Sequence, residues 1–350
     1  MERLRRAPLR AGAAVATAAV AAATLACSGG DRARLLVRTD LPLELRASVE
    51  TSFEALHPDI DIRFSDAPTE ETLEEVLAGG ADFDVWWGAP ARALLRAEAS
   101  GGLLPSAPSW ASNSRHTTAP EGDAGGTSWH PWLATPLVIA FDRTVVALSD
   151  APSDWVDVLH HAWFDEVRVP DPASTEAGAT LVAGMAVAAR RDDNDLNRGF
   201  DWLARLHDQV DGYVPDSRGA VDALRRGDAL LAIMTRADAE AARGSDADWL
   251  HYRLPTSGTP EVVRGVGIVA GATSTEAAST FLDYLGSDDV ATAAKLHTHW
   301  EPLAGAVDDA GMPPGFELPQ NWRGYAPAFD TIAAELDGWV DRWEREVRTR

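Results

Sequence analysis

The chain has 350 residues and a formal net charge of −23, with 54 acidic against 31 basic side chains. This acidic excess argues against nucleic-acid binding, which needs a basic surface, and against charge-driven docking on an anionic membrane. The length suits a large, two-lobed core. Cys27 is the single cysteine, so an internal disulfide is excluded as a source of stability.

The first 33 residues have the pattern of an export signal followed by an anchor. Residues 1–26 combine a basic start with a short apolar run, which is typical of a cleaved signal peptide and too short to span a membrane. Cys27 follows at the expected cleavage point and opens a small tether, residues 27–33. This stretch resembles the lipobox of bacterial lipoproteins, in which the cysteine is lipidated. The alternative is an ordinary signal peptide with an unmodified cysteine.

Between residues 34 and 104, short apolar runs alternate with segments of helical periodicity. Strands are predicted at 35–37, 60–64 and 83–87, and helices at 42–56, 70–78 and 91–100. This alternation predicts parallel βαβ units with helices on both faces of a sheet. Residues 105–128 are rich in Ser, Pro, Asn, Thr and Gly, which predicts a long surface excursion.

The rest of the chain continues the α/β pattern. Strands are predicted at 136–146, 167–169, 229–234 and 262–269, and helices at 153–161, 176–190, 195–208, 220–226, 275–285 and 326–347. Ser153 is a plausible N-cap for the first of these helices.

The order of four passages is similar to that of a known family. They are Phe83–Trp87 with the following helix and Gly101–Leu104, Pro152–Leu159 with Val167–Pro172, Ala223–Ala229, and Gly267–Val269 with Phe281–Leu285. Together they resemble the type II periplasmic solute-binding proteins of ABC importers, in the branch that includes ferric-iron, thiamine and phosphonate binders.

This resemblance implies an α/β fold of two lobes, the type II periplasmic binding protein fold, with hinge-crossing strands and a cleft between the lobes. We expect lobe 1 at residues 34–137, with 262–350 returning to it, and lobe 2 at 138–261. The crossing strands are expected at 137–141 and near 255–265.

The resemblance also implies a function without catalysis or cofactor. We expect a monomeric, extracytoplasmic lipoprotein of the cell envelope, anchored to a membrane by its lipid, that delivers a small solute to an ABC transporter permease. Two alternatives remain open: an exported hydrolase on a similar two-lobed scaffold, and a solute sensor for a signalling partner.

Polar candidates for the binding site lie at strand ends and helix starts. Ser174 and Thr175 precede a predicted helix, where hydroxyls and free backbone N–H groups suit an anion. A helix N-cap without a ligand needs the same residues. Ser217 precedes another helix, and Asp40 and Thr235 end strands, where open α/β sheets bind ligands.

Aromatic candidates come from the 13 tryptophans of the chain. Trp86 and Trp87 are adjacent, so in a strand they face opposite sides, and Trp129 and Trp132 precede the predicted crossing strand. Exposed aromatic faces bind sugars or cationic groups. With Trp129 and one of the adjacent pair as a wall, the cleft would suit a sugar or an amine. The alternative is that these tryptophans only pack the core.

The sequence gives little support for a metal site. The ferric-iron members of the family use adjacent tyrosines, whereas the four tyrosines here are all separated. His297 and His299 flank Thr298 in a segment read as extended, and His160 and His161 are adjacent. Neither pair has a further ligand at metal spacing, so we expect no metal and interpret residues 297–299 as a solvated loop.

Overall fold

The computed structural model describes residues 32–113, 127–244, 248–308, 312, 318, 322–326 and 328–350. Its strands are β1 (Ala33–Arg38), β2 (Ile60–Ser65), β3 (Val85–Pro90), β4 (Leu103–Leu104), β5 (Trp129–Asp142), β6 (Val167–Pro170), β7 (Val210–Val214), β8 (Leu231–Thr235), β9 (Leu250–Arg253), β10 (Thr259–Val269), β11 (Glu301–Pro302) and β12 (Gly324–Tyr325). Its α-helices are α1 (Leu43–Leu56), α2 (Thr69–Leu77), α3 (Ala91–Ala99), α4 (Glu176–Asp193), α5 (Leu196–His207), α6 (Ser217–Arg226), α7 (Arg236–Arg243), α8 (Thr275–Tyr284), α9 (Asp288–Thr298) and α10 (Phe329–Glu346). The expected signal peptide, Cys27 and tether residues 28–31 lie outside the described residues, as do residues 114–126 of the 105–128 excursion. The last tether position, Ala33, is instead the first residue of β1.

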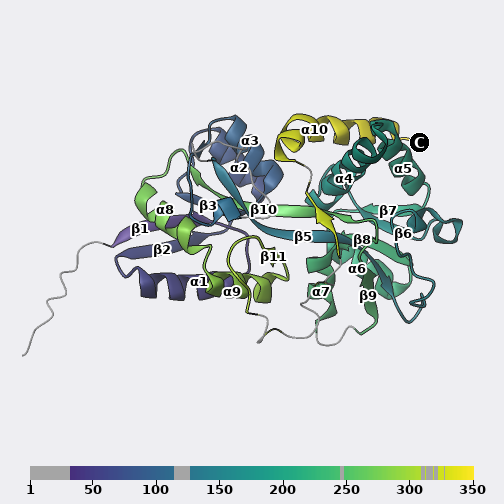
Figure 1. Ribbon diagram of the computed structural model, residues 1–350, viewed down its shortest axis with the longest axis horizontal. Helices are drawn as coiled ribbons and strands as arrows, with labels where there is room; N and C mark the ends of the chain where they lie inside the picture. The colour runs from purple at the N-terminus through teal and green to yellow at the C-terminus, as the bar shows by residue number, and fades with distance from the viewer. Residues whose placement is uncertain are drawn as a thin grey trace, which may run out of the picture.

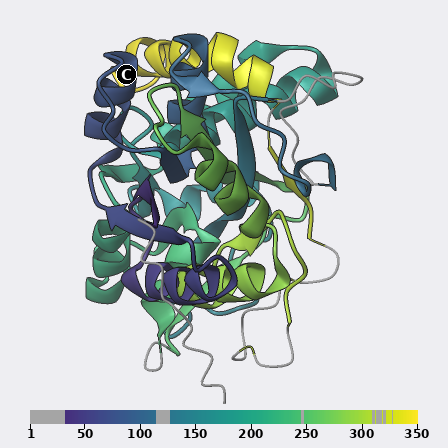
Figure 2. The ribbon, with the colours of Figure 1, turned by 90° about the vertical axis from the view of Figure 1, so that its left-hand side faces the viewer.

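The first lobe contains β1–β4 with helices α1–α3, α8 and α9 (Figure 1). Its strand order is β2-β1-β3-β10-β5, in which β1 pairs parallel with β2 and β3, and β10 pairs antiparallel with β3. Figure 2 shows α1 and α9 side by side along one edge of this lobe. The parallel pairing puts the carboxyl ends of β1 and β3 at the same edge of the sheet.

The second lobe contains β6–β9 with helices α4–α7. Its strand order is β5-β8-β6-β7, with β6 parallel to both β7 and β8. Each of these three parallel strands leads into a helix: β6 into α4, β7 into α6 and β8 into α7. Three helix N-termini therefore begin at one edge of the second sheet.

Two long strands connect the lobes. Residues 129–136 of β5 pair with β10 in the first lobe, whereas residues 137–142 pair with β8 and β9 in the second. β10 runs beside β5 through the middle of the molecule (Figure 1). β5 contains the expected crossing segment 137–141, and β10 overlaps the expected segment near 255–265.

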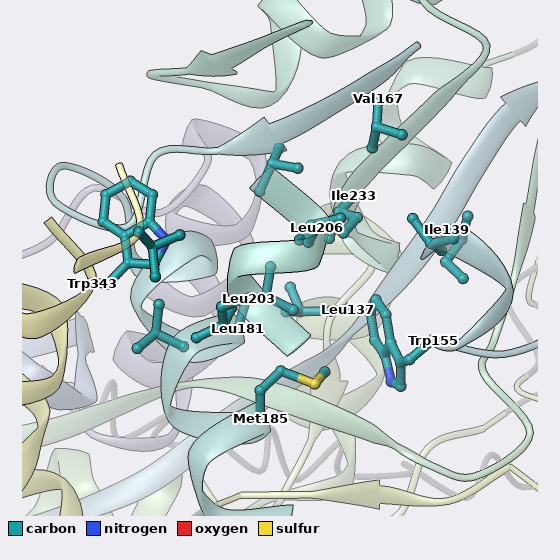
Figure 3. Packing of buried hydrophobic residues seen from close by; sticks show 14 of the residues in the cluster. Leu137, Ile139, Trp155, Val167, Leu181, Met185, Leu203, Leu206, Ile233 and Trp343 are labelled. Atoms are coloured by element: carbon teal, nitrogen blue, oxygen red, sulfur yellow. The ribbon is translucent and has the colours of Figure 1, made fainter. Parts of the chain in front are cut away.

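Helix α10 lies across both lobes. Its first turn meets the first lobe, where the Phe329 ring packs edge-on against Trp129 with centroids 4.9 Å apart. Farther along, Leu336, Trp339 and Trp343 are buried in the core of the second lobe. Figure 3 shows Trp343 among the residues of this core. The range 262–350, expected to return to the first lobe, therefore ends in a helix that packs on both.

One expected helix is replaced by short turns. Residues 153–161, predicted as an α-helix, instead contain the 3₁₀ turns Asp157–Leu159 and His161–Trp163. The Asp157 carboxylate accepts hydrogen bonds from the Ser153 N–H and hydroxyl and from the Asp154 N–H. These bonds lower the pKa of Asp157 and close a local turn that competes with a helix.

His130 of β5 is buried in the first lobe. It is 2 % exposed, with the Ser106 hydroxyl 2.9 Å from Nε2 and the Thr127 hydroxyl 3.3 Å from Nδ1. Burial disfavours the imidazolium and lowers the pKa of His130 to about 4. The neutral ring is therefore the form that the fold stabilises.

We expect His130 to weaken the fold as the solution is acidified. In the unfolded chain the pKa of His130 is about 6.5. The neutral ring therefore makes its full contribution to the free energy of unfolding above that pH, and this contribution is lost as the pH falls from about 6.5 to 4. The loss between pH 7 and 4.5 is about 2 kcal/mol. Denaturant unfolding at both pH values should show a smaller acid effect in His130→Gln than in the wild type. An equal loss in both proteins would contradict this.

Candidate interlobe binding site

A cavity of about 540 Å³ lies between the two lobes. Its first-lobe wall comes from residues that follow β1, from Pro90 at the end of β3 and from the end of α9. Its second-lobe wall includes the first turns of α4, α6 and α7. β10 contributes Val262 and Arg264 between them. Open α/β sheets bind ligands at the carboxyl ends of their strands, and small-molecule pockets commonly have this volume. This cavity is therefore the candidate site.

Side chains cap the three helices at the second-lobe wall. Thr175 accepts the Gly178 N–H at 3.0 Å at the start of α4, and Thr235 accepts the Asp238 N–H at 3.0 Å at the start of α7. Asp216 accepts the Gly219 N–H at 2.8 Å at the start of α6. Each cap satisfies one first-turn donor.

The Thr175 hydroxyl is committed within the protein. Besides accepting from Gly178, it donates to the Asp171 carbonyl oxygen at 2.7 Å. This geometry matches the alternative interpretation of Thr175, in which its side chain caps a helix and binds no ligand. The backbone N–H groups of Glu176 and Ala177, at the first turn of α4, belong to residues that line the cavity.

Arg264 supplies the guanidinium group of the cavity wall. It donates to Asp40 Oδ1 at 2.7 Å and to the Gly88 carbonyl oxygen at 3.2 Å. Its guanidinium carbon lies 5.3 Å from the centre of a Trp300 ring, which is within cation–π range. Arg264 is therefore held in place by three first-lobe groups.

Two carboxyl groups of the second-lobe wall have raised pKa values. Burial raises the pKa of Glu176, and the positive charges of Arg92 and Arg264 only partly oppose this shift. Burial likewise raises the pKa of Asp238, against hydrogen bonds from Thr235 and Ser217. In both cases the protein surroundings penalise the charged form.

The structure gathers four of the predicted site residues at this cavity. Asp40, Thr175, Ser217 and Thr235 all line it. Ser174 precedes the α4 cap but is exposed and is not part of the lining.

The predicted aromatic wall is not found at this cavity. Trp86, Trp87 and Trp129 are 3 %, 0 % and 0 % exposed, respectively, and lie in the core of the first lobe. Trp87 packs against Trp132, with centroids 5.2 Å apart. The physical reason is that β3 and β5 are covered on both faces, so a side chain on either face is buried.

Sequence reasoning missed several lining residues, including Trp300, Glu176, Asp216, Asp238 and Arg264. The signal for Arg264 was available, because it is the charged residue within the otherwise apolar predicted strand 262–269.

Residues 297–299 correct another expectation. His297 and Thr298 end α9, and His299 terminates it with a left-handed φ of 60°. All three line the cavity and are partly buried, so they are not an extended, solvated loop.

Two further observations bear on metal and membrane binding. Among the residues that the structure describes, no three His, Cys, Asp or Glu side chains are grouped so that they could hold a metal ion. Within the same ranges, none of the helices combines the length and apolar character needed to cross a bilayer.

Two α/β lobes, two connecting strands and a cavity at the strand ends define the class of type II periplasmic binding proteins. The sequence model of the bacterial extracellular solute-binding protein family matches residues 45–297. The chain belongs to this family. It is therefore a solute-binding protein of an ABC transporter that works outside the cytoplasm, and it is not an enzyme.

Known relatives and structures agree with this assignment. A probable ABC transporter periplasmic-binding protein of Sinorhizobium fredii is 31 % identical over 268 residues, which cover 73 % of this chain and 70 % of that protein.

Two solved structures have the same fold. AfuA of Actinobacillus pleuropneumoniae, solved with fructose-6-phosphate, has a TM-score of 0.71 at 18 % identity, covering 91 % of this chain and all of that one. The ferric binding protein of Campylobacter jejuni has a TM-score of 0.73 at 14 % identity, covering 89 % and 98 %. These likenesses confirm the predicted fold class.

Proposed function

We propose that this protein captures a small solute in the interlobe cavity and hands it to its ABC transporter permease from a lipid anchor at Cys27. The observation that carries the proposal is the cavity itself, which lies between two lobes and at the ends of their strands. Of the site residues predicted from the sequence, we assign Asp40, Thr175, Ser217 and Thr235 to solute binding. Thr175 would contribute through the start of α4, which its hydroxyl caps.

Closure of the two lobes over the solute would use β5 and β10 as the hinge. We assign residues 34–137 and 138–261 to the two lobes, with the segment after 262 returning to the first and α10 spanning both. A rigid-body motion of this kind keeps each sheet intact while it changes the cavity.

A thermal-shift screen with sugars, amines, amino acids and phosphates tests solute binding. A bound solute stabilises the folded state by RT ln(1 + [L]/Kd), which is about 2.7 kcal/mol at a hundredfold excess over Kd. We expect at least one compound to raise the melting temperature and to be recovered chemically unchanged. A stabilising compound that is instead converted to product would contradict the proposal and favour an enzyme.

We predict that Cys27→Ser releases the protein from membranes into the soluble fraction. The reason is that Cys27 directly follows the apolar run of the signal and is the only thiol available for lipidation. Fractionation of cells that express each form provides the measurement. If the Cys27→Ser protein stays in the membrane fraction as the wild type does, the anchor is not at this residue.

A further inference from the structure

The charged groups that line the interlobe cavity are strongly unbalanced. Four carboxyl groups, those of Asp40, Glu176, Asp216 and Asp238, face one guanidinium, that of Arg264. Arg264 is already paired with Asp40 at 2.7 Å. The excess of negative charge therefore lies on the second-lobe wall.

Among the residues that the structure describes, the three second-lobe carboxyl groups have no cation at ion-pair distance; Arg92 and Arg264 act on Glu176 only from farther away. Within the described ranges, Glu176, Asp216 and Asp238 form no ion pair, and the Glu176 carboxylate makes no hydrogen bond. Asp216 is used as the α6 cap, and Asp238 accepts from the Thr235 hydroxyl at 2.7 Å. Neutral donors stabilise these two groups without balancing their charge.

These carboxyl groups also occupy the positions that would otherwise attract an anion. Glu176 and Asp238 lie in the first turns of α4 and α7, and Asp216 is the N-cap of α6. A helix N-terminus carries a partial positive charge that favours a nearby anion. Here the protein's own carboxylates supply that anion at all three termini, so an anionic solute would meet like charge.

The raised pKa values of Glu176 and Asp238 are consistent with this imbalance. Burial penalises their ionised forms, and the opposing charges, those of Arg92 and Arg264 at Glu176 and that of Arg264 at Asp238, compensate only partly. A cation placed between them would favour the ionised forms.

We propose that the solute is an organic cation, held by the carboxylates of Glu176, Asp216 and Asp238; this rests on the proposed function of the cavity. Its cationic group would lie against the second-lobe wall, and its apolar part against Leu41, Met234 and the ring of Trp300, all of which line the same cavity. The volume of about 540 Å³ suits a small molecule. A bare metal ion fits less well, because the described residues contain no grouped set of three ligands.

Binding of charged probes tests the solute class. Choline, putrescine, spermidine and arginine amide are compared with citrate, glucose 6-phosphate and glucose by thermal shift and calorimetry. We expect stabilisation by cations alone. Glu176→Gln and Asp238→Asn should each weaken cation binding at least tenfold, while Asp341→Asn, an exposed change on α10, should not.

Arg264→Gln distinguishes a cationic from an anionic solute by the direction in which the binding affinity changes. Removing this guanidinium frees Asp40, so a cation should bind at least as tightly as before, whereas an anion that relied on Arg264 would bind more weakly. If citrate, glucose 6-phosphate or glucose binds in the cavity in place of the cations, the cation proposal is overturned and the proposed function stands.

A second measurement does not depend on finding the solute. In a Cys27→Ser background, Ala241→Cys places one thiol in the cavity wall beside Asp238, and Ala333→Cys places one on the exposed face of α10. Cationic and anionic methanethiosulfonate reagents of similar size then report the local charge.

We expect the ratio of cationic to anionic labelling rates to be at least tenfold higher at position 241 than at 333, and to fall when Glu176→Gln and Asp238→Asn are added. Equal ratios at both positions would overturn the cation proposal, whatever the screen finds. If the ratio is high at position 241 and no member of the whole solute screen binds, the proposed function fails rather than the charge assignment.

Discussion

Replacing Trp343 with alanine should lower the free energy of unfolding by about 3–5 kcal/mol, because large-to-small changes in a packed core lose both transfer energy and cavity contacts. Trp343 is 1 % exposed and packs edge-on against Tyr213 with ring centroids 5.0 Å apart. Its indole lies with the second-lobe core residues in Figure 3. The change would therefore loosen the attachment of α10 to the second lobe.

Denaturant unfolding measures this effect, with Glu344→Ala as the matched control. Glu344 is the next residue of the same helix and is exposed, so its removal should change the free energy of unfolding by less than about 0.5 kcal/mol. Equal effects of the two variants would show that α10 is not an integral part of the second lobe.

Gly178→Ala should disturb both the fold and the site. A Cβ at this position would lie 2.5 Å from the Pro170 carbonyl oxygen and 2.6 Å from backbone atoms of Asp171 and Pro172. Because these neighbours are backbone, the first turn of α4 must move away from the end of β6. We expect a loss of about 2–3 kcal/mol in unfolding free energy and at least tenfold weaker solute binding.

Gly338→Ala is the control for this change. Gly338 lies within α10, and a Cβ there would meet nothing within 4 Å. Alanine favours a helix interior by about 0.5–1 kcal/mol over glycine, so this variant should be at least as stable as the wild type and bind solute normally. Wild-type binding by Gly178→Ala would mean that the start of α4 does not shape the site.

The sequence was sufficient to predict an α/β fold because its periodicities are strong, whereas the two-lobed fold class was implied by the resemblance of four passages to a known family. The apolar patterns of β1, β2 and β3 alternate with helical segments, and that alternation predicts the parallel βαβ units that these strands form. β5 and β10 instead pair antiparallel with each other, and also with β8 and β3, respectively. The weaker elements were missed. β7 is only partly buried, and α7 is a short helix of mostly Ala, Arg and Asp directly after β8, so neither has a clear apolar pattern.

The lining of the candidate cavity was partly predictable for a local reason. Thr175, Ser217 and Thr235 stand at strand-to-helix transitions, and such transitions converge in an open α/β sheet. The burial of Trp86, Trp87 and Trp129 could not be read in the same way, because it depends on which segments cover the faces of β3 and β5. Some of these segments are distant in sequence: Phe281 of α8 packs against Trp87, and Phe329 of α10 packs against Trp129.

Small-angle scattering with and without a stabilising solute tests the central claim, capture between two lobes, most directly. We predict that the radius of gyration falls when the solute saturates the protein, because the lobes rotate about β5 and β10 to enclose it. An unchanged radius of gyration at saturation would contradict closure around the solute.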